Sequence, residues 1–168
     1  HLEHGLFRRW DLSSAGPKDS WIASSRYVEA LYRAAGIGAD RLFLSYYGNR
    51  LQAPLPRQGH VRAKLGIPGD CFVVGNINYI YRPKWYLGQT RGLKRHEDVI
   101  DALARVCARR RDVTGLLVGS QWGGGHRYED RLRARAAAVR QGRIIMPGHL
   151  APEDVPGAWS DFDLAVHV

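Results

Sequence analysis

The feature that most constrains the fold is an alternation between short apolar runs and amphipathic segments along most of the chain. Residues 71–75 form a continuous apolar run rich in β-branched side chains, which is typical of a strand buried on both faces of a parallel sheet. Residues 96–110 then repeat apolar side chains at the period of a helix. This alternation predicts an α/β fold with a Rossmann-like parallel sheet and right-handed crossovers.

The alternation occurs on both sides of a non-periodic segment, residues 48–60, that contains two prolines and two glycines. Before it, the pattern predicts a β-α-β unit in which Ser25 caps a helix that ends at Gly36 and a second strand follows at 41–47. After it, we expect strands at 71–75, 113–119, 143–146 and 163–168 and helices at 61–65, 96–110, 128–140 and from residue 152. We therefore predict parts of two domains, residues 1–48 and 61–168, joined by a linker at 49–60.

Three of the predicted strands end in glycine, at Gly75, Gly119 and Gly148. Ligands of doubly wound sheets bind beyond the carboxyl ends of the strands, where a glycine lets the backbone approach a ligand closely. The sequence therefore places a candidate site in the loops after these strands. Turn geometry alone also explains a glycine after a strand, and this alternative stays open for each of the three.

The segment from Asn76 to Lys94 is longer than the usual strand-to-helix connection of roughly two to six residues, which indicates a functional loop. It carries Arg82, Lys84, Arg91 and Lys94 ahead of a predicted helix N-terminus. Cations and unpaired helix N–H groups together bind anions such as a diphosphate. A solvated basic loop is the alternative.

Several kinds of site are disfavoured by the motifs that the sequence lacks. There is no GxxxxGK[ST], GxGxxG or HExxH pattern, which argues against P-loop hydrolysis, dinucleotide binding and a zinc site. The two cysteines, Cys71 and Cys107, are expected to be packed thiols. No Ser/His/Asp order or close carboxylate pair stands out, so the catalytic residues stay unassigned, and no metal or cofactor is predicted.

The formal net charge of +9 suggests a polyanionic partner. Because 21 of the 25 cations are arginines scattered along the chain, codon usage in a GC-rich genome explains the excess equally well. The alternative function is a non-catalytic basic domain that binds RNA or another polyanion through arginines and the aromatics Tyr79, Tyr81, Trp85 and Tyr86. Packing of these aromatics against the sheet or against a missing half is favoured over that role.

No apolar run is long enough for a membrane span, and the first ten residues contain no signal-peptide stretch. We expect a cytoplasmic protein and leave peripheral association with a membrane open. A third possibility for function is an interaction module, whose sheet edge near Val168 pairs with another chain.

Short motifs in a fixed order carry a family resemblance. They lie at residues 21–25, 36–37, 47–49, 61–68, 74–75, 91–98, 117–119, 147–148 and 161–166. This order and spacing, over about residues 19–168, resembles the middle of family 4 (group 1) glycosyltransferases of GT-B fold. The resemblance implies a Rossmann-like sheet of the GT-B type that is incomplete, with the end of the acceptor-side domain followed by the start of the donor-side domain.

The resemblance also implies a function. Such enzymes transfer a sugar from a nucleotide diphosphate sugar to an acceptor, usually with retention of configuration and without a structural metal; the acceptor here is unknown. Lys94 would hold the donor phosphates together with Arg82 or Arg91. The loop after Gly119 and the segment Pro147-Gly148-His149-Leu150 would face the base and ribose.

The sequence departs from the family pattern at four places. Asn76 stands where the family has an arginine, and Arg95 where it usually has glycine. The family's glutamate pair would follow Val168, and its glycine-rich acceptor-side loop has no counterpart. We therefore expect a fragment or truncated product, and leave open whether it is active alone.

Overall fold

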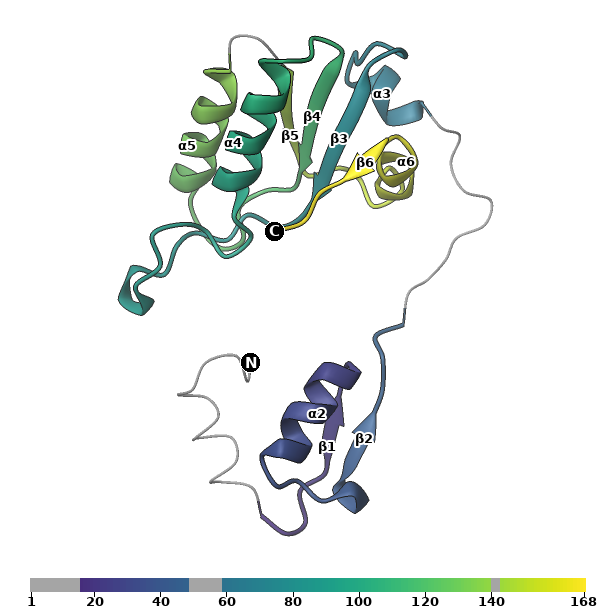
Figure 1. Cartoon of the computed structure of the whole chain (residues 1–168), viewed down its shortest axis with the longest axis vertical. Helices are drawn as coiled ribbons and strands as arrows, with labels where there is room; N and C mark the ends of the chain where they lie inside the picture. Colours follow the sequence, from purple (N-terminus) through teal and green to yellow (C-terminus); the bar gives the residue numbers. More distant parts are fainter. Residues whose placement is uncertain (1–15, 49–58, 140–142) are drawn as a thin grey trace. The chain divides into compact units, whose positions relative to one another are not determined.

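The computed structural model describes residues 16–48, 59–139 and 143–168 of the chain (Figure 1). The chain divides into two compact units, His1–Gln52 and Ala53–Val168. The division falls inside the linker predicted at 49–60, most of which lies outside the described residues.

The first unit contains two parallel strands, β1 (Trp21–Ala23) and β2 (Leu42–Leu44), connected through the helix α2 (Arg26–Ala34) and the 3-10 turn η1 (Ala39–Arg41). The predicted cap is confirmed, because the Ser25 hydroxyl accepts a hydrogen bond of 3.2 Å from the Val28 N–H. The second strand is shorter than the predicted 41–47, because β1 offers only three residues for pairing.

The second unit is a four-stranded parallel sheet with the order β5-β4-β3-β6. Its strands are β3 (Phe72–Ile77), β4 (Val113–Val118), β5 (Arg143–Gly148) and β6 (Leu164–Ala165). Its helices are α3 (His60–Lys64), α4 (His96–Cys107), α5 (Arg127–Ala137) and α6 (Val155–Ser160), with a 3-10 turn η2 (Trp85–Leu87) in the loop before α4. The predicted α/β, Rossmann-like parallel fold is confirmed.

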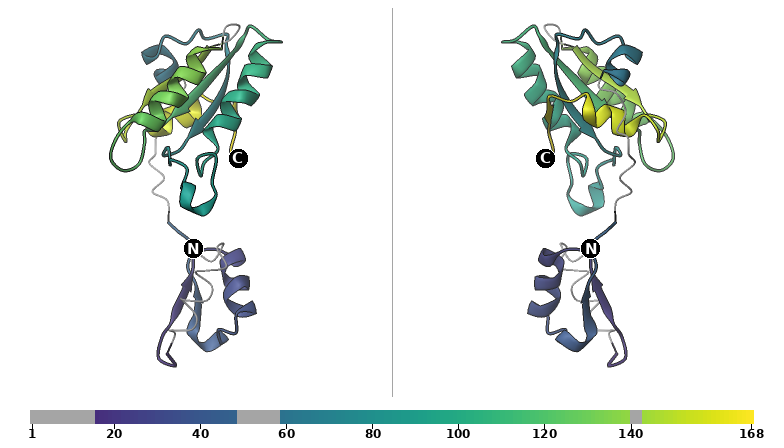
Figure 2. Two further views of the ribbon diagram at one scale, coloured as in Figure 1. Left: turned by 90° about the vertical axis from the view of Figure 1, so that its left-hand side faces the viewer. Right: turned by 90° about the vertical axis from the view of Figure 1, so that its right-hand side faces the viewer.

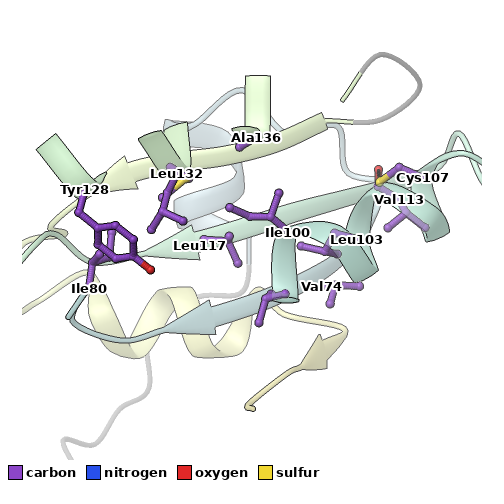
Figure 3. Packing of buried hydrophobic residues seen from close by; sticks show 12 residues of the cluster. Val74, Ile80, Ile100, Leu103, Cys107, Val113, Leu117, Tyr128, Leu132 and Ala136 are labelled. Carbon is purple, nitrogen blue, oxygen red and sulfur yellow. Dashed lines mark hydrogen bonds between the residues drawn. The ribbon is translucent and has the colours of Figure 1, made fainter. Parts of the chain in front are cut away.

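Helices cover both faces of this sheet (Figures 1 and 2). Figure 3 shows how α4 and α5 pack on one face, where Ile100, Leu103 and Leu132 meet Val74 and Leu117 of the strands. On the other face, α3 and α6 bury a second cluster that includes Val61, Val73, Leu116 and Ala158. Both faces of β4 are therefore buried, which accounts for the absence of charged residues from its sequence.

A buried carboxylate holds α3 to the end of α6. Asp161 is fully buried, and its Oδ2 accepts hydrogen bonds from the N–H groups of Val61 (2.8 Å) and Arg62 (2.9 Å). The Arg62 guanidinium, itself 8% exposed, donates back to the Asp161 carbonyl (2.7 Å) and to the Asp163 carboxylate (2.7 Å). The contact satisfies free N–H groups at the start of α3, a helix too short to be stable alone.

Several predicted boundaries differ from the structure. The helix predicted at 96–110 ends at Cys107, and Val106, in its last turn, is 41% exposed. The strand predicted at 163–168 is reduced to β6, which pairs only with β3. Both cysteines are free thiols, as predicted; Cys107 is buried and Cys71 half-buried.

None of the helices in the described part of the chain is both long enough and apolar enough to cross a membrane.

Candidate functional site

The four strands of the second unit are parallel, so their carboxyl ends meet at one edge of the sheet. Backbone hydrogen bonds hold the loops after β3, β4 and β5 together at this edge. The Asn78 N–H donates to Val118 O (3.0 Å), and the Gly119 N–H donates to Gly148 O (2.8 Å). The predicted site residues Gly119 and Gly148 therefore lie side by side at the ends of adjacent strands.

Gly119 has a position that only glycine fits. Its φ is 128°, and a Cβ built on it would lie 2.0 Å from the carbonyl oxygen of Asn78. Any side chain would push the loop after β3 away from the loop after β4.

The strand end predicted at Gly75 is wrong by two residues, because β3 continues through Asn76 to Ile77. Gly75 pairs with Leu116 in β4 and with Ala165 in β6. A Cβ at Gly75 would lie 2.2 Å from the Phe162 ring, so packing of that ring accounts for the glycine. Its place within the strand gives no support to a role in ligand binding.

Four aromatic rings gather at the carboxyl edge, in the loops after three adjacent strands; we call Tyr79, Tyr81, Trp122 and His149 the aromatic cluster. The Tyr79 ring lies 4.8 Å from the Trp122 ring and 5.4 Å from the His149 ring, centroid to centroid, in edge-to-face geometry. Tyr81 lies 6.3 Å from Trp122. The Tyr79 and Trp122 side chains are 44% and 57% exposed, so the cluster offers aromatic surface to a ligand.

The backbone between these rings is fixed by a buried residue. Ile80 is 1% exposed and forms a parallel bridge with Gln121. The Ile80 N–H donates to Ser120 O (3.0 Å), and its carbonyl accepts from the Trp122 N–H (2.9 Å). Because neighbouring side chains of an extended segment alternate in direction, burial of Ile80 turns Tyr79 and Tyr81 outward.

Of the residues predicted to face a base and ribose, the structure brings His149 into the aromatic cluster. Leu150 is half-buried and packs against the hydrophobic core that α3 and α6 cover, so its role is in the core. The sequence reasoning assigned Tyr79 and Tyr81 to packing and did not single out Trp122. One feature of the sequence could have indicated the cluster. An aromatic residue follows the end of each of two neighbouring strands, β3 and β4, by two or four positions.

A chain of polar side chains links the end of β3 to the segment after β6. The Asn76 amide, in a residue only 3% exposed, donates to Val166 O (2.6 Å) and accepts from the Asn78 amide (2.8 Å). The Asn78 amide nitrogen also lies 3.3 Å from His167 Nδ1. Asn76, which stands where the resemblance expects an arginine, therefore positions backbone at the site edge.

The predicted phosphate-binding cations differ in their partners. Arg91 forms an ion pair with Asp98, and Arg95 contacts the same carboxylate. Within residues 16–48, 59–139 and 143–168, no acidic side chain forms an ion pair with Arg82 or Lys94. Lys94 is half-buried and lies two residues before α4. Of the predicted phosphate-binding cations, it and Arg82 are therefore the two that are available to an anion.

A buried tyrosine fixes the loop at the start of α4. The Tyr128 hydroxyl accepts from the Gly92 N–H (3.0 Å) and donates to Glu97 Oε1 (2.5 Å). Burial, and then the hydrogen bond and charge of Glu97, raise the pKa of Tyr128, so the phenol stays protonated at physiological pH. Tyr128 thereby positions the backbone two residues before Lys94, a role that the sequence did not reveal.

The first residue of α4, His96, is a buried neutral base. It is 2% exposed, and its Nδ1 has no hydrogen-bond partner among the described residues. Burial lowers the pKa of His96 below its ordinary value of 6.5, against the nearby charge of Glu97 that raises it. The imidazole is therefore uncharged at pH 7 and adds no cation to the site.

A surface pocket of about 270 Å³ lies between the loop and the helices α4 and α5. Its lining includes Arg91, Arg131 and Arg135 together with Glu97. Arg135 forms an ion pair of 2.7 Å with Asp101, and Arg91 forms one with Asp98. Two of the three arginines that line the pocket are therefore already neutralised by acidic side chains. Among the described side chains, no three His, Cys, Asp or Glu residues gather as a metal site requires.

No protein-family model matches the chain, and no curated protein matches it. Solved structures do match it. One is a crystal structure of HepE from Anabaena in complex with UDP and glucose, which is 23% identical with a TM-score of 0.68. The match covers 99% of this chain and 42% of the HepE chain. Its complex with UDP-glucose is 22% identical, with a TM-score of 0.64, over 97% of this chain and 42% of that one.

A glycosyltransferase from Rickettsia africae is 15% identical, with a TM-score of 0.62, over 98% of this chain and 41% of that chain. The chain thus spans less than half the length of each of these proteins. At this level of sequence identity, the comparison shows that the chain shares the fold of these proteins. The carboxyl edge described above is part of that shared fold.

Proposed function

We propose that the chain is the donor-binding part of a nucleotide-sugar glycosyltransferase of GT-B type, similar to family 4. The observation that carries the proposal is the aromatic cluster, which lies open to solvent at the carboxyl edge of a parallel sheet. The segment between β3 and α4 that carries two of its rings also carries Arg82 and Lys94. The shared fold with structures that hold UDP or UDP-glucose supports this choice of ligand.

In this proposal, the aromatic cluster stacks on the base, and backbone groups at Gly119 and Gly148 face the base and ribose. Lys94 and Arg82 bind the diphosphate with charge-assisted hydrogen bonds. Arg91 contributes less, because Asp98 holds its guanidinium. UDP is the first nucleotide to test, since the HepE structures hold UDP or UDP-glucose.

During sugar transfer, negative charge develops on the departing nucleotide diphosphate. Cations placed at the diphosphate stabilise that charge, which is an electrostatic contribution to the rate. We propose transfer with retention, without a metal or cofactor, and leave the acceptor unassigned. The chain matches about two fifths of each neighbour, so donor binding is proposed for the chain itself and transfer for the whole protein.

Fluorescence of Trp122 tests the base-stacking step. UDP should quench the wild-type emission to saturation at one equivalent, and the variant Trp122→Phe should lose that part of the signal because a base stacks on the indole. UMP should bind more weakly than UDP, since it lacks the second phosphate. Equal quenching in wild type and variant would contradict the proposed place of the base.

Salt dependence separates this function from polyanion binding, the alternative that the exposed aromatics and the net charge of +9 favour. Nonspecific binding to RNA should weaken steeply as salt rises, because phosphate binding releases counterions. A nucleotide pocket should retain base preference and one-to-one saturation. Tight binding of single-stranded RNA with no preference among UDP, GDP and dTDP would support the alternative.

A further inference from the structure

The far end of the long loop exposes three large apolar side chains that the proposed donor site does not use. Trp85, Tyr86 and Leu87, which we call the loop tip, form η2 and are 83%, 64% and 40% exposed. Figures 1 and 2 show this turn, in teal, projecting beyond the strands and helices of its own unit. Exposed apolar side chains grouped at one place, rather than scattered singly, indicate a contact surface.

Several backbone groups in and next to the loop tip are hydrogen-bonded within the loop. The Leu87 N–H donates to Lys84 O (2.9 Å), and the Gly88 N–H donates to Trp85 O (2.9 Å). The Lys84 N–H is taken by the Gln89 side-chain oxygen (3.0 Å). A turn closed in this way can move into less polar surroundings without leaving these groups unpaired.

The charge around the loop tip has one sign. Between Asp70 and Glu97 the sequence contains five cations and no acidic residue. Two of the five, Arg91 and Arg95, contact Asp98. Lys84 directly precedes the tip and forms no ion pair with the described residues, so its charge is available to an anionic surface.

We propose that the loop tip inserts into the headgroup region of an anionic membrane, with Lys84 at the lipid phosphates. Tryptophan and tyrosine favour this region because each has an apolar body and a polar end. Basic residues next to them add attraction to acidic lipids. The inference does not depend on the proposed donor site.

The geometry of the tip favours a lipid surface over single-stranded RNA. The Trp85 and Tyr86 rings lie 6.0 Å apart at an interplanar angle of 87°, so they do not provide parallel platforms for successive stacked bases. Leu87, which completes the tip, has no aromatic face. A small exposed apolar turn without acidic neighbours instead fits the headgroup region of a negatively charged membrane.

Vesicle sedimentation with the full chain tests the proposal. The protein should pellet with vesicles of equal parts phosphatidylcholine and phosphatidylglycerol and stay in solution with phosphatidylcholine alone. Trp85→Ser should lower the partition coefficient about tenfold through loss of buried apolar surface. Lys84→Gln should lower it about fivefold, the effect of one cation near a charged membrane.

Matched variants control for exposure and charge. Trp159→Ser changes a tryptophan that is 49% exposed on α6, and Lys18→Gln removes an exposed lysine of the first unit; both should bind vesicles like wild type. Trp85→Ser should keep wild-type UDP binding and thermal stability, so loss of vesicle binding is separable from failure of the donor site.

Three outcomes would overturn the proposal. The wild-type chain could stay in solution with the anionic vesicles. Trp85→Ser could pellet as much as wild type, which would assign the attraction to the net charge of +9. Single-stranded RNA, and not vesicles, could bind through Trp85, which would make the tip a nucleic-acid surface.

Discussion

At the scale of single residues, the buried carboxylate of Asp161 makes the clearest contribution to stability. It accepts N–H groups at the start of α3, while Arg62 beside it is 8% exposed. Asp161→Ala should lower the free energy of unfolding by about 3 kcal/mol, because it leaves the buried N–H groups of Val61 and Arg62 without their acceptor. Denaturant unfolding measures this loss.

Glu153→Ala is the matched control for that variant. Glu153 is an exposed acid in the same region, so its removal should change stability by less than about 0.5 kcal/mol. A cost for Asp161→Ala as small as that of the control would contradict the assigned role.

His96 predicts a pH dependence of stability. The unfolded chain binds a proton at this residue below pH 6.5, its ordinary pKa, whereas burial lowers the pKa in the folded state. The unfolded state then binds more protons, so stability should fall as pH drops from 7 to 5. His96→Asn should flatten this slope, measured by denaturant unfolding at each pH.

Measurement between pH 7 and pH 5 separates the contribution of His96 from those of the carboxylates. Glu129 and Asp163, whose hydrogen bonds to backbone or arginine lower their pKa values, lose their contributions at more acidic pH. His149→Asn, at an exposed histidine, is the control and should keep the wild-type slope. A slope unchanged in His96→Asn would exclude His96 as its source.

Residue roles were predictable from the sequence where they depend on near neighbours. The Ser25 cap involves a residue three positions away and was identified correctly. The contacts of Asp161 with α3 and of Tyr128 with Glu97 span 100 and 31 residues, so no local pattern indicates them. Of these contacts, that of Tyr128 fixes the loop that carries Lys94, since its hydroxyl also accepts from the Gly92 N–H.

At the scale of elements, the contact between the loops after β3 and β4 depends on Gly119. Gly119→Ala should cost about 3 kcal/mol of stability and weaken UDP binding, because a Cβ would lie 2.0 Å from Asn78 O at a φ of 128°. Gly124→Ala, in the same loop but with open space around it, should leave both unchanged. Thermal melting and a UDP titration of the two variants test this.

The periodicity of the sequence predicts whether a segment is a helix or a strand, but it does not predict where the helix or strand ends. The apolar stripe of α4 and the continuous apolar run at 71–75, most of which lies in β3, each fit one class of structure. Strand ends depend on partners: β3 continues past Gly75 because Leu117 and Val118 of β4 pair with its last two residues, whereas β6 has only two residues paired. Loops that carry the aromatic cluster show no periodicity, so the meeting of Tyr79 with Trp122 was not predictable.

At the scale of the whole molecule, the chain combines two units of the same α/β type but unequal completeness. In the second unit both sheet faces are covered by helices. In the first, Ile22 and Phe43 pair across the two-stranded sheet and are 69% and 54% exposed. Alternating side-chain direction places them on the face away from α2, so the described part of this unit presents exposed apolar side chains on that face.

The central claim is that this molecule binds a nucleotide diphosphate at the carboxyl edge of its second sheet through Lys94. Isothermal titration calorimetry of UDP tests it most directly. We predict one site per wild-type chain and a loss of about 1–3 kcal/mol of binding free energy in Lys94→Ala, the range for a charge-assisted hydrogen bond. Lys18→Ala should bind UDP like wild type. Binding of UDP, GDP and dTDP that Lys94→Ala leaves unchanged would contradict the claim.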